Sequence, residues 1–335
     1  MQHRSTILFS VLTVAIVALF VADIALGSVD IPLRAVVASL TGGEVDASLR
    51  SIVLDIRLIK AIMALLAGAA LSASGLQMQT LFRNPLAGPY VLGVSAGASF
   101  GVALFLLGAP LLGIASHPAV QTIGTAGAAW AGAAAILFLV MSLARRIKDI
   151  MVILILGMML SSAIGAAVEI LQYMSNEAAL KSFVVWTMGS LGDVTYAQLA
   201  IVAPVIIAGI VLAIIAIKPM NMLLLGENYA RTMGLDIRRT RLTIFLSTTL
   251  LAGTITAFCG PIGFVGLAVP HLARMLFRSA DHRTLVPASL LIGIAMMLAC
   301  DIVAKSLTLP INTVTALMGI PIVVYIVTRN RSLFR

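Results

Sequence analysis

Uninterrupted apolar runs of about 20 residues recur along the whole of this 335-residue chain. A helix needs about 20 apolar residues to cross the hydrocarbon core of a bilayer. Apolar residues make up 61% of the sequence and charged residues 10%, and the mean hydropathy is +1.10. An ordinary soluble domain is about 45–50% apolar and about 25% charged. The chain is therefore predicted to lie in a membrane, which argues against soluble enzymes, disordered chains, coiled coils and nucleic-acid-binding proteins.

The continuity of the apolar runs predicts an all-α, polytopic membrane protein rather than a barrel. The strands of a membrane barrel would alternate apolar and polar residues. Residues 1–335 are expected to form a single transmembrane domain, because the longest polar excursions cover only residues 27–57 and about 218–240. Ten helical spans are expected, the eighth of them short and rich in Gly and Pro, at residues 6–26, 58–79, 90–108, 119–143, 150–172, 196–217, 241–259, 263–279, 285–304 and 311–328.

The distribution of basic residues predicts the orientation of these spans. Ten spans place both termini on one side, and 16 of the 22 Lys and Arg residues fall on that side. Basic residues concentrate on the cytoplasmic side of membrane proteins, so both termini are expected in the cytoplasm. The other side holds six basic residues, which are Arg34, Arg50, Arg57, Lys60, Lys181 and Lys305.

Motifs for chemical catalysis are missing or lack their structural context. No G-x-x-x-x-G-K-[ST] loop occurs in the sequence, so the chain has no visible means of hydrolysing ATP. Gly93–Gly97 matches G-x-S-x-G, but it begins an apolar helix, where small residues usually serve packing. Cys259 and Cys300 lie inside apolar runs, and no His has a second His at metal-binding spacing. We therefore expect no catalytic residue, metal site or cofactor.

Few ionisable residues fall inside the expected spans, where each is costly. Asp301 and Lys305 are four residues apart on one helix face and are expected to pair. The others are Glu169 within the fifth span and Asp23 near the outer end of the first span. An ion-driven carrier usually needs more carboxylates in mid-span, so this scarcity favours a permease driven from outside the membrane. An ion-coupled secondary transporter remains the alternative.

The histidines are predicted to have structural or solvent-exposed positions. His271 follows Pro270 within the eighth span and is expected to be a hydrogen-bonded structural group. His3 and His282 lie at the ends of spans and are expected to be solvated on the cytoplasmic side.

Two glycine-rich segments interrupt the apolar pattern. Gly226–Gly234 has helix-forming residues between its glycines, which predicts a short helix across the cytoplasmic face. This helix either rests on lipid headgroups or docks into a cytoplasmic partner. Gly260–Leu267 predicts a broken helix, which is tolerated at membrane depth only where protein or water covers its backbone. In transporters such breaks often lie near the transport path.

An ordered set of short motifs runs through the chain from about Arg57 to Pro321. It consists of Ala67–Ala70, Gln79 with Arg83–Ala87, Leu92–Ala98, Trp186 with Met188-Gly189, Gly226…Ala230…Gly234, Gly263–Leu267 with Pro270-His271 and Arg274, Asp281–Arg283, Asp301, and Leu309-Pro310 with Gly319 and Pro321. In this order the motifs resemble those of the permease subunits of ABC importers for iron complexes and vitamin B12, the iron-siderophore, haem and cobalamin permease family.

The resemblance implies the type II ABC importer permease fold, with ten helices per chain, a homodimer and a substrate path along the dimer axis. It implies import of an iron complex (ferric siderophore or haem) or vitamin B12 through the inner membrane of a bacterial cell, by a subunit that is not itself an enzyme. The implied partners are two cytoplasmic ABC ATPase subunits, a periplasmic or lipid-anchored substrate-binding protein, and membrane lipid.

The resemblance also assigns roles to residues on the cytoplasmic side. Arg83, Asn84 and Pro85 match a family motif at a cytoplasmic turn. The element that couples the permease to the ATPase is expected to comprise Gly226, Glu227, Asn228, Tyr229, Ala230, Arg231, Thr232, Met233 and Gly234.

On the outer side, Arg57, Lys60 and Lys305 match basic positions that meet acidic residues of the binding protein. The family often has Arg where Lys60 and Lys305 stand, and Lys keeps the charge but loses bidentate recognition of a carboxylate. Asn312 replaces a usual Gly, which affects the expected packing of the tenth helix.

Three residues are candidates for the lining of the substrate path, namely Ser161, Ser162 and Trp186. They belong to the fifth span and its outer flank. The serines are equally consistent with helix packing, and the tryptophan with an anchor at the membrane interface.

Overall fold

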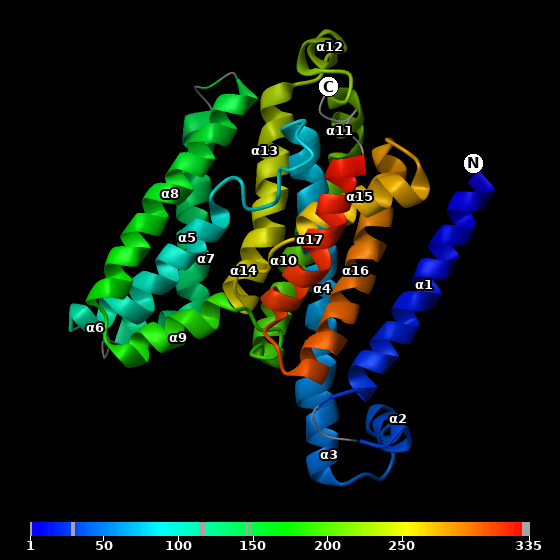
Figure 1. Cartoon of the computed structure of the whole chain (residues 1–335), viewed down its shortest axis with the longest axis vertical. Coiled ribbons are helices and arrows are strands. Elements are labelled where there is room, and N and C mark those ends of the chain that lie inside the picture. Colours follow the sequence, from blue (N-terminus) through cyan, green and yellow to red (C-terminus); the bar gives the residue numbers. More distant parts are fainter. Residues whose placement is uncertain (1, 28–30, 114–117, 145–146, 148, 330–335) are drawn as a thin grey trace.

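The structure is a computed structural model that describes residues 2–27, 31–113, 118–144, 147 and 149–329. These residues form helices joined by turns and short extended segments, and no strand occurs in this part of the chain. Most of the helices run along one long axis and pack side by side (Figure 1). The predicted all-α, polytopic fold is thereby confirmed.

Ten helical stretches coincide with the ten expected spans. Among the described residues, seven helices are both long and apolar enough to cross a bilayer. The remaining three stretches are α4, which is 23 residues long, and the shorter apolar helices α15 and α17. In chain order the stretches are α1 (Gln2–Ala25), α4 (Ile59–Leu81), α5 (Val94–Ala103) with η2 (Leu104–Gly108) and α6 (Ala109–Leu111), α7 (Pro118–Ala144), α8 (Ile150–Met174), α10 (Tyr196–Ile215), α13 (Ile237–Thr248) with η3 (Thr249–Gly253) and α14 (Thr254–Cys259), α15 (Val265–Phe277), α16 (His282–Leu307) and α17 (Ile311–Arg329).

Helices also form in segments that the sequence analysis treated as polar connections. The side chain of Asn176 caps one of them by accepting a hydrogen bond from the backbone N–H of Ala179. The side chain of Asp46 caps another by accepting from the backbone N–H of Ser48. Such N-caps allow a helix to start within a polar segment. The additional helices are α2 (Leu33–Thr41), α3 (Ala47–Ser51), η1 (Ile52–Leu58), α9 (Glu177–Thr187) and α11 (Ile217–Leu223). α12 (Glu227–Thr232) is the short helix that was expected between Gly226 and Gly234.

α4 is the central helix, and small residues let its neighbours approach it closely. It packs against α16, α15, α10 and α13. Gly68 lies directly against the backbone of Gly293 in α16, and Gly75 lies against the backbone of Gly266 in α15. A Cβ atom at Gly68 or Gly75 would collide with the carbonyl group opposite. These contacts explain the run of small residues in α4, because close backbone approach favours association of helices in lipid.

The predicted helix break lies between α14 and α15, in residues 260–264, and side chains from other helices satisfy its backbone. The hydroxyl of Tyr90 donates to the carbonyl oxygen of Ile262 at 2.9 Å. The N–H of Gly263 donates to Oδ1 of Asn312 at 3.0 Å. Asn312 therefore has a definite role in the tenth span, because it pairs an amide that would otherwise be unsatisfied away from water.

A buried cluster of charged side chains joins the end of α1 to α4 and α16. Nζ of Lys305 lies 2.8 Å from Oδ1 of Asp23 and 2.8 Å from Oδ2 of Asp301. The expected Asp301–Lys305 pair is thus confirmed, and it also engages α1. Nζ of Lys60 lies 3.2 Å from Oδ1 of Asp301. Two ammonium groups balance two carboxylates, which is the condition under which charges are tolerated in a protein interior.

Replacing Lys305 by Met is expected to destabilise the protein by about 3–5 kcal/mol, because it leaves two buried carboxylates with too few partners. The measurement is the thermal unfolding midpoint of the purified protein in detergent. Lys181→Met removes an exposed lysine from α9 and is the matched control, with little change expected. An unchanged midpoint for Lys305→Met would show that the cluster does not hold α1 in place.

Candidate functional site

The short helix α12 lies at the end of the molecule where α1 begins and α17 ends (Figure 1). Gly226 precedes it with a φ of 102° and Gly234 follows it with a φ of 86°, conformations that glycine adopts far more readily than other residues. Ala230 is fully buried, and its carbonyl oxygen accepts a hydrogen bond from the N–H of Leu235 at 3.0 Å. The helix predicted in this segment is therefore present, and it is packed firmly on its inner face.

The outer side of α12 carries exposed apolar side chains. Leu225 is 62% exposed, Tyr229 56% and Met233 45%. Leu225 and Met233 flank α12, and Tyr229 lies within it. We call these three residues the α12 surface. A well-anchored element with exposed apolar side chains is suited to contact with another protein.

A salt bridge connects α12 to the start of α13. Nη2 of Arg241 lies 2.6 Å from Oε1 and 2.8 Å from Oε2 of Glu227, and Nε of Arg241 lies 3.2 Å from Oε1. The Arg241 side chain is only 9% exposed, so the pair is shielded from water on one side. The sequence analysis did not single out Arg241. The available signal was an arginine at the first position of an expected apolar span.

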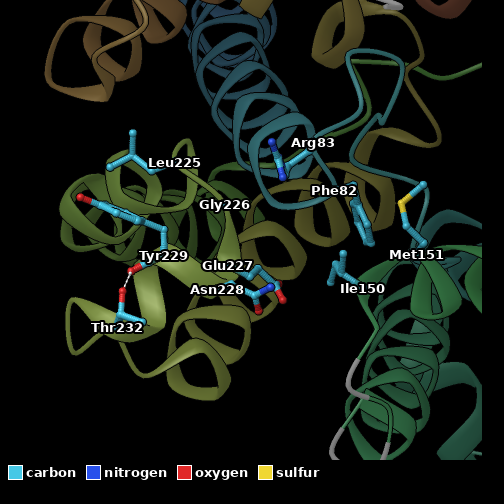
Figure 2. A pocket seen from close by; sticks show the side chains of 10 residues that line it. All are labelled: Phe82, Arg83, Ile150, Met151, Leu225, Gly226, Glu227, Asn228, Tyr229 and Thr232. Carbon is cyan, nitrogen blue, oxygen red and sulfur yellow. Dashed lines mark hydrogen bonds between the residues drawn. The ribbon is translucent and has the colours of Figure 1, made fainter.

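A groove of about 930 Å³ separates α12 from the end of α4 and the start of α8. Figure 2 shows Glu227 and Asn228 of α12 on one side, with Phe82, Ile150 and Met151 across from them, while the ring of Tyr229 points away. Arg83 lies above the groove, on the α4 side (Figure 2). Along the groove, α12 is separated from α4 and α8, while its inner face remains packed.

The Arg83-Asn84-Pro85 motif ends α4. Arg83 has a φ of 47°, and the N–H of Asn84 donates to the carbonyl oxygen of Gln79 at 3.2 Å, as in a Schellman C-cap. The carbonyl oxygen of Pro85 is hydrogen-bonded to Nε2 of His271 in α15 at 2.8 Å. The prediction that His271 is a hydrogen-bonded structural group is thus confirmed, and the motif ties α4 to α15.

His282 is not solvated, and in this respect the sequence prediction was wrong. Its side chain is 1% exposed and is hydrogen-bonded to Asn221 and Thr80. The reason is that α11 covers the start of α16, a contact that the position of His282 in the sequence does not reveal. Asp281 caps α16, and the N–H of Arg283, together with the side-chain amide of Asn221, holds the pKa of Asp281 below its usual range.

The three predicted docking cations lie close together at the opposite end of the molecule, but they do not form an exposed basic surface. Arg57 is buried and donates to the carbonyl oxygen of Ala25, the last residue of α1, at 2.6 Å. Lys305 is also buried, within the charged cluster, and Lys60 is 22% exposed. The end of α1 provides Arg57 and Lys305 with acceptors. Docking itself stays a prediction.

The three candidates for the path lining lie in α8 and α9. Ser161 and Ser162 each donate to a carbonyl oxygen one turn earlier in α8. Trp186 packs beside Phe183, with 6.2 Å between ring centroids, and lines a cavity of about 390 Å³ that neither serine reaches. Their role in a path stays a prediction.

Comparison with known proteins identifies the family. Residues 14–329 match the model of the FecCD transport family. The chain is 33% identical to the hemin transport system permease protein HmuU of Yersinia pestis, over 98% of this chain and 97% of that protein. It is 36% identical to the vitamin B12 import system permease protein BtuC of Klebsiella pneumoniae, over 83% of this chain and 82% of that protein. A solved structure of a metal-chelate type ABC transporter in an inward-facing conformation superposes with a TM-score of 0.82 and 31% identity, over 96% of this chain and 99% of that one.

These similarities, together with the bundle of long apolar helices, define an ABC transporter permease subunit that crosses the membrane several times. The chain belongs to the FecCD transport family.

Replacing Arg241 by Met is expected to increase amide hydrogen exchange in residues 227–233 about tenfold or more. The charge-assisted bonds to Glu227 would be lost, and such bonds contribute about 1.5–3 kcal/mol. Mass spectrometry of exchanged peptides measures the effect. Arg239→Met is the matched control, because Arg239 forms an exposed pair with Asp236 and such pairs contribute little. Equal protection of α12 in both variants would contradict this role of Arg241.

Proposed function

We propose that two copies of this chain form the path of an ATP-driven importer, and that α12 of each copy docks into a separate cytoplasmic ABC ATPase subunit. A periplasmic or lipid-anchored binding protein delivers the substrate to the opposite end. In this proposal the protein lies in the bacterial inner membrane with both termini in the cytoplasm, and the chain itself does not hydrolyse ATP.

The observation that carries this proposal is the construction of α12. Gly226 and Gly234 flank the helix, and its inner face is buried at Ala230. Arg241 forms a salt bridge with Glu227. Its outer side offers Leu225, Tyr229 and Met233 to a partner. Because α12 is held firmly, a force applied to it is transmitted to the helices behind it. A loop lying on lipid would need no such anchoring.

The charged cluster argues against the alternative of an ion-coupled secondary transporter. A coupling-ion site needs carboxylates that can exchange their cation. Asp23 and Asp301 are both engaged by Lys305, and Asp301 also by Lys60. These carboxylates therefore serve helix packing, and the energy for uptake is expected to come from the ATPase at the α12 end.

The proposed substrate is an iron complex (ferric siderophore or haem) or vitamin B12. Support comes from the relatives, which include a hemin permease matched over nearly the whole chain and a vitamin B12 permease matched over most of it. For the binding protein, Lys60 is the best placed of the three predicted docking residues, because part of its side chain remains accessible.

The proposal is tested by transport into liposomes that contain the chain, its ATPase and its binding protein. Haem, cyanocobalamin and a ferric hydroxamate siderophore are offered separately. One of them is expected to accumulate against its gradient when ATP is present on the α12 side, and an uncoupler should have no effect. Accumulation by the chain alone, driven by an ion gradient, would overturn the proposal and support a secondary transporter.

Replacing Tyr229 by Asp is expected to weaken binding of the ATPase subunit about tenfold or more, because a charge would be placed in the centre of an apolar contact. Affinity is measured by titrating purified ATPase onto the permease in detergent. Tyr229→Phe keeps the ring and is expected to bind like the native chain. Native affinity in the Asp variant would show that the α12 surface is not the docking site.

A further inference from the structure

Asn221 occupies a position between α12 and the bundle. It lies in α11, which leads into α12 through residues 224–226 and packs against both α4 and α16. Its side chain makes hydrogen bonds to the first residues of α16. A displacement of α12 in the direction of α11 therefore reaches Asn221 before it reaches α4 and α16.

The orientation of the Asn221 amide follows from its two unambiguous partners. The backbone N–H of His282, which can only donate, lies 2.9 Å from Oδ1. The carboxylate of Asp281, which accepts, lies 2.6 Å from Nδ2. Carbonyl and amino ends of the side chain are thus distinguished by their chemistry.

This orientation also determines how the imidazole of His282 is bonded. Nδ1 of His282 lies 2.7 Å from Oδ1 of Asn221, which is an acceptor, so Nδ1 carries a proton and donates it. Nε2 then faces the hydroxyl of Thr80 at 2.8 Å. In the neutral imidazole Nε2 can only accept a hydrogen bond. The Thr80 hydroxyl also lies 2.9 Å from the carbonyl oxygen of Leu76. Its one proton is therefore shared between Nε2 of His282 and this carbonyl oxygen.

The three side chains thus form a continuous bonded path from α11 through the start of α16 to the end of α4. His282 and Thr80 are both buried. Breaking either bond would leave a polar atom without water or protein to pair with, which is costly. The path is therefore expected to move as a unit rather than to come apart when α11 is displaced.

α4 and α16 are themselves joined along their length. They run antiparallel, with Lys60 against Asp301 at one end and Gly68 against Gly293 in the middle. At the α12 end, Thr80 of α4 is hydrogen-bonded to His282 of α16. A shift delivered through His282 would therefore be applied to a helix pair that spans the molecule.

We propose that Asn221 and His282 are positioning residues that transmit the movement of α12 into the α4–α16 pair. This inference rests on the proposed docking of an ATPase at α12. In it, Thr80 is the receiving group on α4, and the hydrogen bonds of the imidazole carry the displacement.

The test compares variants of His282 in the complete complex of permease and ATPase. Orthovanadate with ATP traps the nucleotide-bound state, and amide hydrogen exchange is followed in residues 78–84, 227–233 and 283–286. In the native complex, trapping is expected to change exchange in all three regions. In His282→Leu the changes at residues 227–233 and 283–286 should persist, because the N–H of His282 and the carboxylate of Asp281 still bond Asn221. The change at residues 78–84 should fall roughly fivefold, as for the loss of a buried hydrogen bond.

Two conservative variants separate the contributions of Nδ1 and Nε2 of the imidazole. His282→Asn keeps a donor near the position of Nδ1 and loses contact with Thr80, so only the response of residues 78–84 should fall. His282→Gln keeps a polar group near the position of Nε2 and loses only the side-chain bond to Asn221, so the response of residues 78–84 should be retained. A group that merely stabilises the fold would not produce this pattern.

Thr80 provides an independent pair of variants that does not depend on the folding of His282→Leu. Thr80→Val removes the hydroxyl at constant shape and should reduce the response of residues 78–84, whereas Thr80→Ser should not. In the His282→Asn background, Thr80→Val should add no further loss. Equal and additive losses in both backgrounds, or native responses in His282→Leu, would overturn the inference.

The outcome also distinguishes this inference from the proposed function on which it rests. If residues 227–233 of the native complex do not respond to trapping, docking at α12 is wrong. If they respond in every variant and the α4 and α16 regions respond as well, only the role of Asn221 and His282 is wrong.

Discussion

The pairing of polar groups that lie away from water is the constraint on which the rest of the structure depends. In lipid an unpaired backbone or side-chain group costs several kcal/mol. The helix break is possible because Tyr90 and Asn312 supply partners for its backbone. The end of α1 is held because Arg57 and Lys305 donate to its last carbonyl groups and to Asp23. Each irregular feature is thus accompanied by a side chain from a distant segment.

The same constraint organises the molecule from one end to the other. α4 and α16 are joined by a charged contact, by a glycine contact and by a histidine–threonine contact, in antiparallel order. The pair is therefore stiff, and its two ends lie beside the two regions where partners are proposed to act. The α12 helix is connected to this pair through α11 and to α13 through Arg241. Stiffness between the two ends is what an ATP-driven change at one end would need in order to alter the other.

Much of the fold followed from the sequence. A helix in a membrane makes all its backbone hydrogen bonds internally, and it is visible in the sequence as a run of apolar residues. The ten spans, the break before Val265, the Asp301–Lys305 pair and the helix after Gly226 were all predicted on such local grounds. α2 and α9 were not, since an N-cap such as Asn176 begins a helix inside a polar stretch that resembles a loop. The candidate site was predicted as a segment, while Arg241, Thr80 and Asn221 were overlooked because their partners are far away in the chain.

The sequence by itself determined the class of protein, its ten helical stretches and the position of the short helix α12, since composition and local periodicity control whether a segment can remain in a bilayer. Only the tertiary structure decided which polar residues are exposed. His282 and Arg57 resemble surface groups in the sequence, and both are buried by helices from elsewhere in the chain. A side chain's partners depend on which helices pack beside it, and that is a property of the assembled bundle rather than of any one segment.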